Sequence, residues 1–345
     1  MNLKIYTSQE PLFTEAGSIL EAPFNIAYNT YGTLNAERNN VIWICHALTG
    51  NSDAADWWNG LVGKNKLFDP AGYFIVCANV IGSAYGSTGP LSVNPATGSS
   101  YFHSFPLLTI RDVVQTLERL RIYLGITGIH TLIGGSLGGQ QALEWAIENP
   151  DLHEHLVLTA TCARSSAWSI AINESQRIAI EADSTWATNS PEAGLSGLKA
   201  ARAIALLSYR NYATYKFSQA ENDDEIFDDF KASGYQRYQG IKLTKRFNTF
   251  SYWTLSKMMD SHNVGRGRDS VESALSRIRA QTLVIGIRSD ILFPVAEQKF
   301  LARYIPDAEY AEIDSSYGHD GFLTECNKLT VCVKEFSRLR NVKVA

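Results

Sequence analysis

A serine between glycines stands where a strand-like run of the sequence meets a helix-like one. Residues Gly134-Gly135-Ser136-Leu137-Gly138 match the pattern G-x-S-x-G. Glycine lacks the Cβ atom that would collide in a sharp strand-to-helix turn, so the pattern predicts a strained turn with an exposed Ser136 hydroxyl. The start of the following helix offers free backbone N–H groups and the positive end of the helix dipole. We therefore interpret Ser136 as a nucleophile rather than as an inert serine in a tight turn.

A catalytic serine needs a base that removes its proton and an acid that orients the base. Asp290 lies in GIRSDILFP, after the apolar run 282–287, and His319 lies further on in SSYGHDGFL. The order Ser136, Asp290, His319 resembles that of α/β-hydrolase triads, and each residue stands where parallel sheets place their active sites. We predict that these three side chains form the triad. Asp320, which follows His319, is the alternative orienting acid, but its side chain is expected to point elsewhere.

Acyl transfer through a serine also needs hydrogen-bond donors for the negative oxygen of the transition state. We predict that the backbone N–H groups of Leu137 and Leu48 supply them. Leu137 follows the nucleophile, and Leu48 lies in HALTG, after the strand-like run VIWIC. His46 opens that segment, and we interpret it as shaping the loop rather than as the base. Three further histidines flank predicted strands and are interpreted as ordinary structural residues: His130, His153 and His155.

The apolar runs of the sequence predict the frame that holds these residues. Five short runs are mostly apolar, as in strands buried on both faces of a parallel sheet: 41–45, 73–80, 131–135, 155–162 and 282–287. Between them, residues 110–124 place apolar side chains at helical spacing, and Gly125 follows as a stop signal. The sequence therefore predicts an α/β protein with a mostly parallel sheet flanked by helices. Together with the order of the candidate triad residues, this arrangement resembles the α/β-hydrolase fold.

The composition and the hydrophobic pattern of the sequence are different between residues 164 and 271. This stretch combines long helical patterns with many Ala, Ser and aromatic residues and lacks a convincing buried strand. We interpret 164–271 as a helical lid inserted into an α/β core that consists of 1–163 and 272–345. The acidic run 221–229 within the insertion is interpreted as a solvated surface.

The composition excludes several classes of protein. Lys and Arg total 31 against 35 Asp and Glu, a formal charge of -4, so no broad basic surface is expected for nucleic acid or anionic membrane. A hydrophobic fraction of 45% excludes a disordered chain. No apolar run reaches the roughly 18 residues of a membrane span, and the first residues lack the pattern of a signal peptide. We expect a cytoplasmic protein with small-molecule partners.

The cysteines indicate neither a disulfide framework nor a metal site. They are odd in number, well separated and mostly within apolar runs, which favours buried, reduced thiols: Cys45, Cys77, Cys162, Cys326 and Cys332. The spacing of Cys326 and Cys332 fits neither a redox pair nor a zinc knuckle. We predict no metal.

Beyond the serine motif, the sequence resembles the homoserine O-acetyltransferase family of α/β-hydrolase-fold acyltransferases. The resemblance rests on HALTG (46–50), GSTGPLSVNPATG (86–98), FPLLTIRDVV (105–114), GGSLGGQQALEW (134–145), VGRGR (264–268) and SSYGHDGFL (315–323). It implies a ping-pong reaction in which acetyl-CoA acylates Ser136, CoA leaves, and the hydroxyl of L-homoserine takes the acetyl group, for methionine synthesis. Acetyl-CoA would be a co-substrate, with no bound cofactor, and His319 would serve as base and then as acid.

The resemblance also implies how the amino acid is held. Arg210, in LLSYRN of the predicted lid, matches the arginine that recognises the substrate carboxylate, and Asp320 suits the substrate ammonium. The alternative for Arg210 is a salt bridge within the lid. The family further implies a homodimer joined through the lid helices and a tunnel for pantetheine beneath the lid.

The sequence departs from the family at a few places and leaves some questions open. Asn248 stands in RFNTFSY where an acidic residue is expected, and Leu137 and Gln140 stand where Met is frequent. The acyl donor remains open between acetyl-CoA and succinyl-CoA. An ester hydrolase with the same triad and a non-catalytic binding module also remain open as functions, because the fold alone does not decide between them. Seven basic residues are candidates for contacts to CoA phosphates: Lys199, Arg202, Lys242, Lys245, Arg246, Arg266 and Arg268.

Overall fold

A computed structural model describes residues 3–341 of the chain. Its centre is an eight-stranded sheet with the strand order β1-β4-β6-β5-β7-β8-β9-β10. The first two strands in that order, β1 (Lys4–Ser8) and β4 (Phe24–Tyr31), run antiparallel to their neighbours, whereas β5 to β10 pair in parallel. The parallel strands are β5 (Val41–Cys45), β6 (Phe74–Ala78), β7 (Ile129–Gly135), β8 (His153–Thr159), β9 (Gln281–Ile287) and β10 (Glu309–Ile313).

The predicted strands are confirmed, with shifted ends. The runs 41–45, 131–135 and 282–287 lie within β5, β7 and β9, and the runs 73–80 and 155–162 contain or overlap β6 and β8. The strands of the parallel centre are buried almost throughout, because helices cover both faces. A short separate hairpin of β2 (Leu12–Phe13) and β3 (Ile19–Leu20) lies outside this sheet.

Two hydrophobic clusters cover the two faces of the sheet. On one face pack α2 (Ile110–Tyr123), α3 (Leu137–Glu148) and α10 (Val295–Tyr304), with the predicted apolar side of α2 buried. On the other face pack α12 (Cys326–Asn341) and the segment after α1 (Ala54–Trp57). Shorter elements connect these: η1 (Phe102–Ser104), α9 (Val271–Leu275), η2 (Gly318–Asp320) and α11 (Gly321–Thr324). The mostly parallel sheet flanked by helices that the sequence predicts is thus confirmed.

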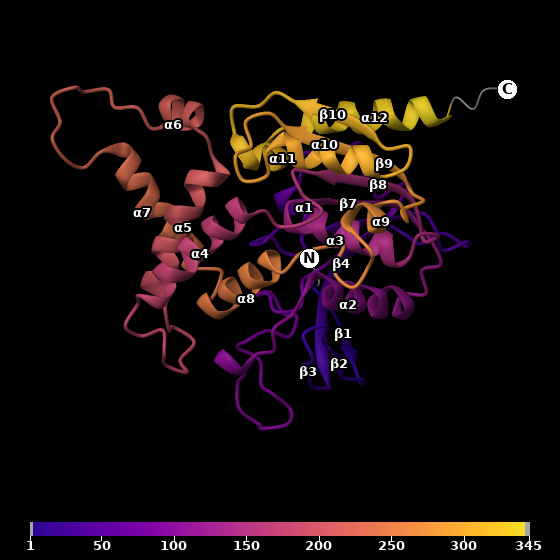
Figure 1. The fold of residues 1–345 in the computed structure, drawn as a ribbon, viewed down its shortest axis with the longest axis horizontal. Coiled ribbons are helices and arrows are strands. Elements are labelled where there is room, and N and C mark those ends of the chain that lie inside the picture. The colour runs from indigo at the N-terminus through magenta and orange to yellow at the C-terminus, as the bar shows by residue number, and fades with distance from the viewer. Residues whose placement is uncertain (1–2, 342–345) are drawn as a thin grey trace.

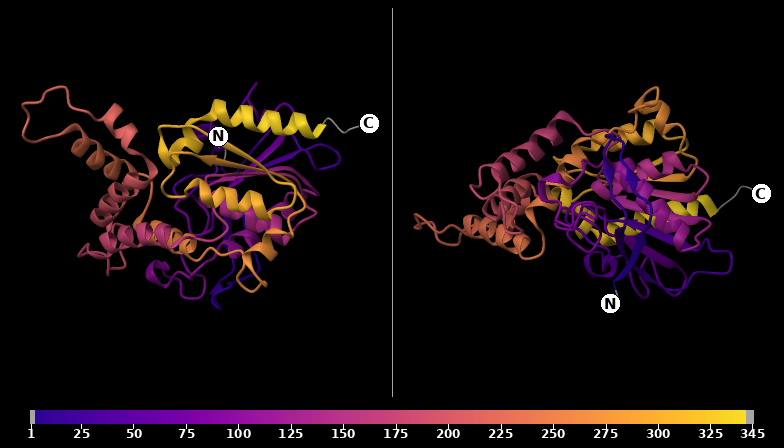
Figure 2. Two further views of the ribbon diagram at one scale, coloured as in Figure 1. Left: turned by 45° about the horizontal axis from the view of Figure 1, so that its top comes forward. Right: turned by 90° about the horizontal axis from the view of Figure 1, so that it is seen from below.

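The helices of the stretch 164–271 gather beside the sheet rather than on its faces (Figures 1 and 2). They are α4 (Ala167–Glu181), α5 (Leu195–Tyr209), α6 (Tyr212–Ser218), α7 (Lys231–Thr244) and α8 (Thr249–Asp260). Figure 2 shows α6 and α7 farthest from the core, joined by a long loop that includes the exposed acidic run 221–229. A bridge between Arg164 and Asn263 links the two ends of the stretch. We call α4 to α8 the lid.

None of the helices in the described part of the chain combines the length and apolar character required to cross a membrane. The longest, α12, has 16 residues and carries several charged side chains.

Candidate active site

Ser136 occupies a strained turn between β7 and α3. Its backbone has φ 56° and ψ -127°, which a non-glycine residue adopts only where the surroundings enforce it. The flanking glycines are required by close approach: a Cβ atom on Gly138 would lie 2.0 Å from the carbonyl oxygen of Cys45, and one on Gly134 would lie 2.2 Å from that of Gly138. The sequence pattern and the observed geometry therefore have the same steric cause.

His319 and Asp290 form a buried pair at the ends of two neighbouring strands. His319 Nδ1 lies 2.7 Å from Asp290 Oδ2, and the two side chains are 4% and 0% exposed. The other carboxylate oxygen of Asp290 accepts hydrogen bonds from the backbone N–H groups of Leu292 (2.8 Å) and Phe293 (2.9 Å). Asp290 is thus fixed as an acceptor, so the proton of a neutral His319 lies on Nδ1 and its Nε2 is free to act as a base.

The surroundings of His319 set its basicity. Burial lowers the pKa of the imidazole, but the charge and hydrogen bond of Asp290, together with the charge of Asp320, outweigh it, so the pKa is raised above its ordinary value. Phe293 and Phe322 pack around the ring with centroids 5.4 and 5.3 Å away. Asp320, the alternative orienting acid, does not bond to this ring, because its carboxylate faces Arg210.

Ser136 and His319 line the same pocket, which has a volume of about 410 Å³. Leu48, Arg210 and Asp320 line it as well, so the pocket gathers residues predicted from distant parts of the sequence. Within the described residues the Ser136 hydroxyl makes no hydrogen bond to His319. Substrate-free active sites commonly show this, and the contact forms when the substrate binds.

The loop that contains Leu48 is held from the core side by His46. Burial lowers the pKa of His46 to about 4, so its ring is neutral. His46 Nε2 accepts a hydrogen bond from the Val80 backbone N–H (3.0 Å), and Nδ1 lies 2.8 Å from the Ala47 carbonyl oxygen. Both ring nitrogens are used for structure, as the interpretation of His46 as a loop-shaping residue requires. The backbone N–H groups of Leu48 and Leu137 donate to no other described residue, so both can serve an oxyanion.

Arg210 and Asp320 form an ion pair at the pocket wall. Arg210 Nε lies 2.9 Å from Asp320 Oδ2, and the two side chains are 23% and 14% exposed. The two atoms form an ion pair without a hydrogen bond between them. Burial raises the pKa of Asp320, against the opposing charges of Arg210 and then Arg202. Arg210 ends α5, and Asp320 ends the 3-10 turn η2 that also carries His319. The pair therefore joins the lid to the turn that carries His319.

Only some of the basic residues considered for CoA phosphates are near the pocket. Arg202, Lys242 and Arg246 line it, whereas Lys199 and Lys245 do not. Arg266 and Arg268 lie elsewhere, in ion pairs with carboxylates of the core, Glu15, Glu144 and Glu148. The motif VGRGR therefore ties the segment after α8 to the helices of the core.

The departures from the family pattern lie outside the pocket. Asn248 is the N-cap of α8, where its side-chain oxygen accepts a hydrogen bond from the Ser251 backbone N–H at 2.8 Å. Asp and Asn cap helices about equally well, so the helix cap is kept despite this departure. The side chains of Leu137 and Gln140 are fully buried beneath the turn.

Several pocket residues were not predicted from the sequence. Thr49, Asp56, Trp57 and Tyr209 line the pocket, and Tyr85 contacts Arg246, which lines it too. They come from separate loops and helices. Thr49 lies in the motif HALTG and Tyr209 lies in LLSYRN, whereas the other three lie in no motif that marks them as functional.

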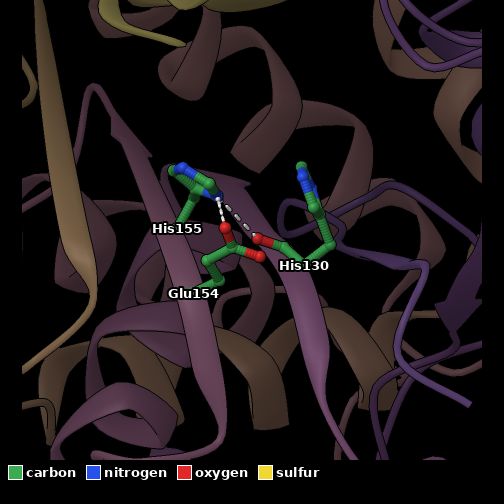
Figure 3. Close-up of side chains that lie close together, drawn as sticks. All are labelled: His130, Glu154 and His155. Carbon is green, nitrogen blue, oxygen red and sulfur yellow. Dashed lines mark hydrogen bonds and ion pairs between the residues drawn. The ribbon is translucent and has the colours of Figure 1, made fainter. Parts of the chain in front are cut away.

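His130, Glu154 and His155 lie together at the start of β7 and β8, the opposite end of the strands from Ser136 (Figure 3). One potential ligand atom from each lies within 4.8 Å of the others, and these are groups that transition metals accept. Both rings already bond within the protein: His155 Nδ1 lies 3.0 Å from the His130 carbonyl oxygen, and His130 Nδ1 lies 2.9 Å from Thr131 Oγ1. The expectation of no metal stays a prediction, and the position of the cluster separates it from the Ser136 pocket.

Comparisons with known proteins show which families the chain resembles. A sequence profile of the alpha/beta hydrolase fold matches residues 40–325, which confirms the fold predicted from the sequence. The chain is 49% identical to a homoserine O-acetyltransferase of Cyclobacterium marinum, over 97% of this chain and 95% of the relative. It is 45% identical to a homoserine O-acetyltransferase of Chlorobium chlorochromatii, over 96% of this chain and 94% of the relative.

Solved structures resemble the chain over nearly its whole length. The crystal structure of a homoserine O-acetyltransferase from Bacillus anthracis superposes with a TM-score of 0.91 at 26% identity and covers 97% of each chain. The acetyl esterase MekB superposes with a TM-score of 0.85 at 24% identity, covering 97% of this chain and 96% of its own. The second likeness concerns the fold alone.

Proposed function

The chain belongs to the homoserine O-acetyltransferases of the α/β-hydrolase fold, and from that premise we propose that Ser136, His319 and Asp290 transfer an acetyl group from acetyl-CoA to L-homoserine. The observation that carries the proposal is the buried Asp290–His319 pair, at 2.7 Å, in the pocket that Ser136 also lines. The product, O-acetylhomoserine, would serve methionine synthesis. The resemblance to this family that the sequence motifs indicated is confirmed by the identity of 45–49% to its members over nearly the whole chain.

In the first half of the reaction, Ser136 Oγ attacks the thioester carbonyl carbon while His319 Nε2 takes the hydroxyl proton. The carbonyl oxygen becomes an oxyanion that accepts hydrogen bonds from the N–H groups of Leu48 and Leu137. The carbon–sulfur bond then breaks, and the CoA sulfur leaves as a thiol with the proton from His319. The enzyme is left as an acetyl ester of Ser136.

In the second half, the same groups act in reverse order. The homoserine hydroxyl gives its proton to His319 and attacks the ester carbonyl, and the oxyanion again binds at Leu48 and Leu137. The bond to Ser136 Oγ breaks, and His319 returns the proton to that oxygen. The raised pKa of His319 makes the imidazole a stronger base in both halves, and the imidazolium that forms can return its proton to the leaving group.

Selection of an amino acid acceptor over water is assigned to Arg210 and Asp320. Their opposite charges lie 2.9 Å apart at the pocket wall. An amino acid is a zwitterion with the same two charges, so its carboxylate can bind Arg210 and its ammonium can bind Asp320. Because Asp320 adjoins His319 in sequence, an acceptor held there is placed close to the base.

Arg210→Ala should raise the KM for homoserine by about 10- to 100-fold, the usual cost of a hydrogen bond to a charged group. The first half of the reaction does not use this contact, so the burst of CoA release on mixing with acetyl-CoA should keep its rate. Steady-state kinetics with varied homoserine and a stopped-flow burst measure the two effects. A lower burst rate with an unchanged KM for homoserine would contradict the assigned role.

Arg202 and Lys242 are our candidates for contacts to the CoA phosphates. Both line the pocket, and neither donates a hydrogen bond to another described residue. The Arg202 guanidinium instead lies over the ring of Tyr209, 5.4 Å from its centroid. Cations that are free of protein acceptors remain available to a phosphate.

Intact-protein mass spectrometry tests the proposed function directly. The protein is mixed with acetyl-CoA or succinyl-CoA, and homoserine, serine or water is then supplied. We expect an acetyl adduct that disappears with homoserine but persists with serine. A succinyl adduct in place of acetyl would change the donor, and rapid loss of the adduct in water alone would favour an ester hydrolase.

A homodimer through the lid is part of the proposal. Large apolar side chains on the lid are exposed, with exposed fractions of 60% for Leu207, 79% for Tyr212, 92% for Phe217 and 94% for Phe227. Such a concentration is typical of a surface covered by another protein. Size-exclusion chromatography with light scattering should give twice the mass of one chain, and a monomer at micromolar concentration would exclude the dimer.

We also place the reaction in the cytoplasm. All five cysteines are unpaired, as is usual in a reducing compartment.

A further inference from the structure

Arg246 connects the lid to the loop that contains Leu48. It lies between α7 and α8, and its Nη1 donates hydrogen bonds to the Thr49 carbonyl oxygen (2.6 Å) and the Tyr85 hydroxyl (2.5 Å). Its Nη2 lies 3.4 Å from the Thr49 hydroxyl oxygen. These are contacts between the lid and two separate loops of the core.

The loop that Arg246 contacts is a tight turn. The Gly50 N–H donates to the Ala47 carbonyl oxygen at 2.8 Å, so Leu48 and Thr49 are its two central residues. A hydrogen-bonded turn moves as a unit, and a bond to the Thr49 carbonyl therefore also fixes the Leu48 N–H. His46 holds the turn from the core side, whereas Arg246 holds it from the lid side.

The position of Arg246 is itself well defined. The next residue, Phe247, is 3% exposed, and its ring contacts that of Tyr85 with centroids 5.6 Å apart. Tyr85 thus packs against one lid residue and accepts a hydrogen bond from its neighbour. The buried Phe247 fixes the backbone next to Arg246, and the Thr49 carbonyl and Tyr85 hydroxyl oxygens fix its guanidinium.

We propose that Arg246 is a positioning residue that holds the Leu48 N–H in place for the oxyanion, so that seating of the lid completes the oxyanion hole. This inference rests on the proposed function and adds a role for a residue outside the triad. The competing role is a direct contact with a CoA phosphate, since Arg246 also lines the pocket.

The two roles differ in which steps need Arg246. The oxyanion hole serves both halves of the reaction and every acyl donor. A phosphate contact serves only the half that uses CoA. A donor without phosphates, and the second half started from acetylated enzyme, therefore separate the two roles.

The experiment compares Arg246→Ala, Arg246→Lys and Lys245→Ala, with the fold of each checked by circular dichroism and thermal melting. Lys245→Ala removes the same charge from the neighbouring exposed position, which does not line the pocket. Acylation is measured with acetyl-CoA and with S-acetyl-N-acetylcysteamine, a thioester without phosphates. Acetylated enzyme, freed of donor, is then mixed with homoserine and its deacylation rate is measured.

Arg246→Ala should slow all three rates by a similar factor, on the order of 10- to 100-fold, because a misplacement of roughly 1 Å costs about 100-fold. The KM for homoserine should stay within about twofold, Lys245→Ala should match the wild type, and Arg246→Lys should recover part of the loss by donating to the same acceptors. Slower acylation by acetyl-CoA alone would overturn the proposal in favour of a phosphate contact, and unchanged rates would overturn both roles. Failure of the proposed function differs from these outcomes, since the wild type itself would then form no acetyl adduct.

Discussion

Ser136→Ala should abolish acetyl transfer, with kcat reduced by on the order of 10⁴- to 10⁶-fold, the loss seen when a nucleophile is removed from a triad. Without the hydroxyl no acyl ester can form, and the remaining groups only stabilise an oxyanion and bind substrates. The measurement is the steady-state rate of CoA release with homoserine present, together with the mass of the protein after mixing with acetyl-CoA. The expected mass is that of the unmodified variant.

Ser83→Ala is the matched control for this loss. Ser83 is also a buried serine, 3% exposed, and its hydroxyl has no hydrogen-bond partner among the described residues. Removing it should leave both the adduct and the rate near those of the wild type. An acetyl adduct of normal yield on the Ser136→Ala protein would show that another residue is the nucleophile.

Two members of the proposed triad, Ser136 and Asp290, could be singled out in the sequence because each follows from a local requirement. Ser136 needs glycines around it for steric reasons that are visible in the sequence, and Asp290 follows a strand whose apolar residues identify it. The strand boundaries were less certain, since burial ends gradually at strand ends. β10 was missed because it is only half buried, and its sequence EYAEI carries charged residues at two of five positions.

The contacts between the lid and the core could not be predicted. Arg246, Thr49 and Tyr85 are separated by long stretches of sequence and meet only through the path of the lid, which local patterns do not determine. The same limit applies to cations in general. Arg266 and Arg246 both lie in basic motifs, yet one pairs with Glu15 of the core and the other reaches the pocket. Neither the net charge nor the motif shows whether such an arginine pairs with the core or lines the pocket, because its partners come from distant elements.

Asp290→Asn should lower kcat by on the order of 10⁴-fold while leaving the fold intact. The side-chain oxygen of an asparagine can keep the hydrogen bonds from the backbone N–H groups of Leu292 and Phe293. Its NH₂ group then faces His319 Nδ1, which must become an acceptor. The imidazole proton moves to Nε2, the nitrogen that has to take the proton of Ser136, so the base is lost although every atom stays in place.

The pH dependence gives this variant a second readout. In the wild type, kcat/KM should rise with pH as His319 loses its proton. This rising limb of the pH profile should lie above the ordinary histidine range, because Asp290 and Asp320 raise the pKa of His319 by more than burial lowers it. Asp290→Asn removes one of the two negative charges that favour the imidazolium, so the pKa of His319 falls and the limb of the residual activity shifts to lower pH. Thermal melting should remain close to that of the wild type. A loss of less than about tenfold, with the limb unmoved, would show that Asp290 does not orient the base, because neither the tautomer nor the charge at His319 would depend on it.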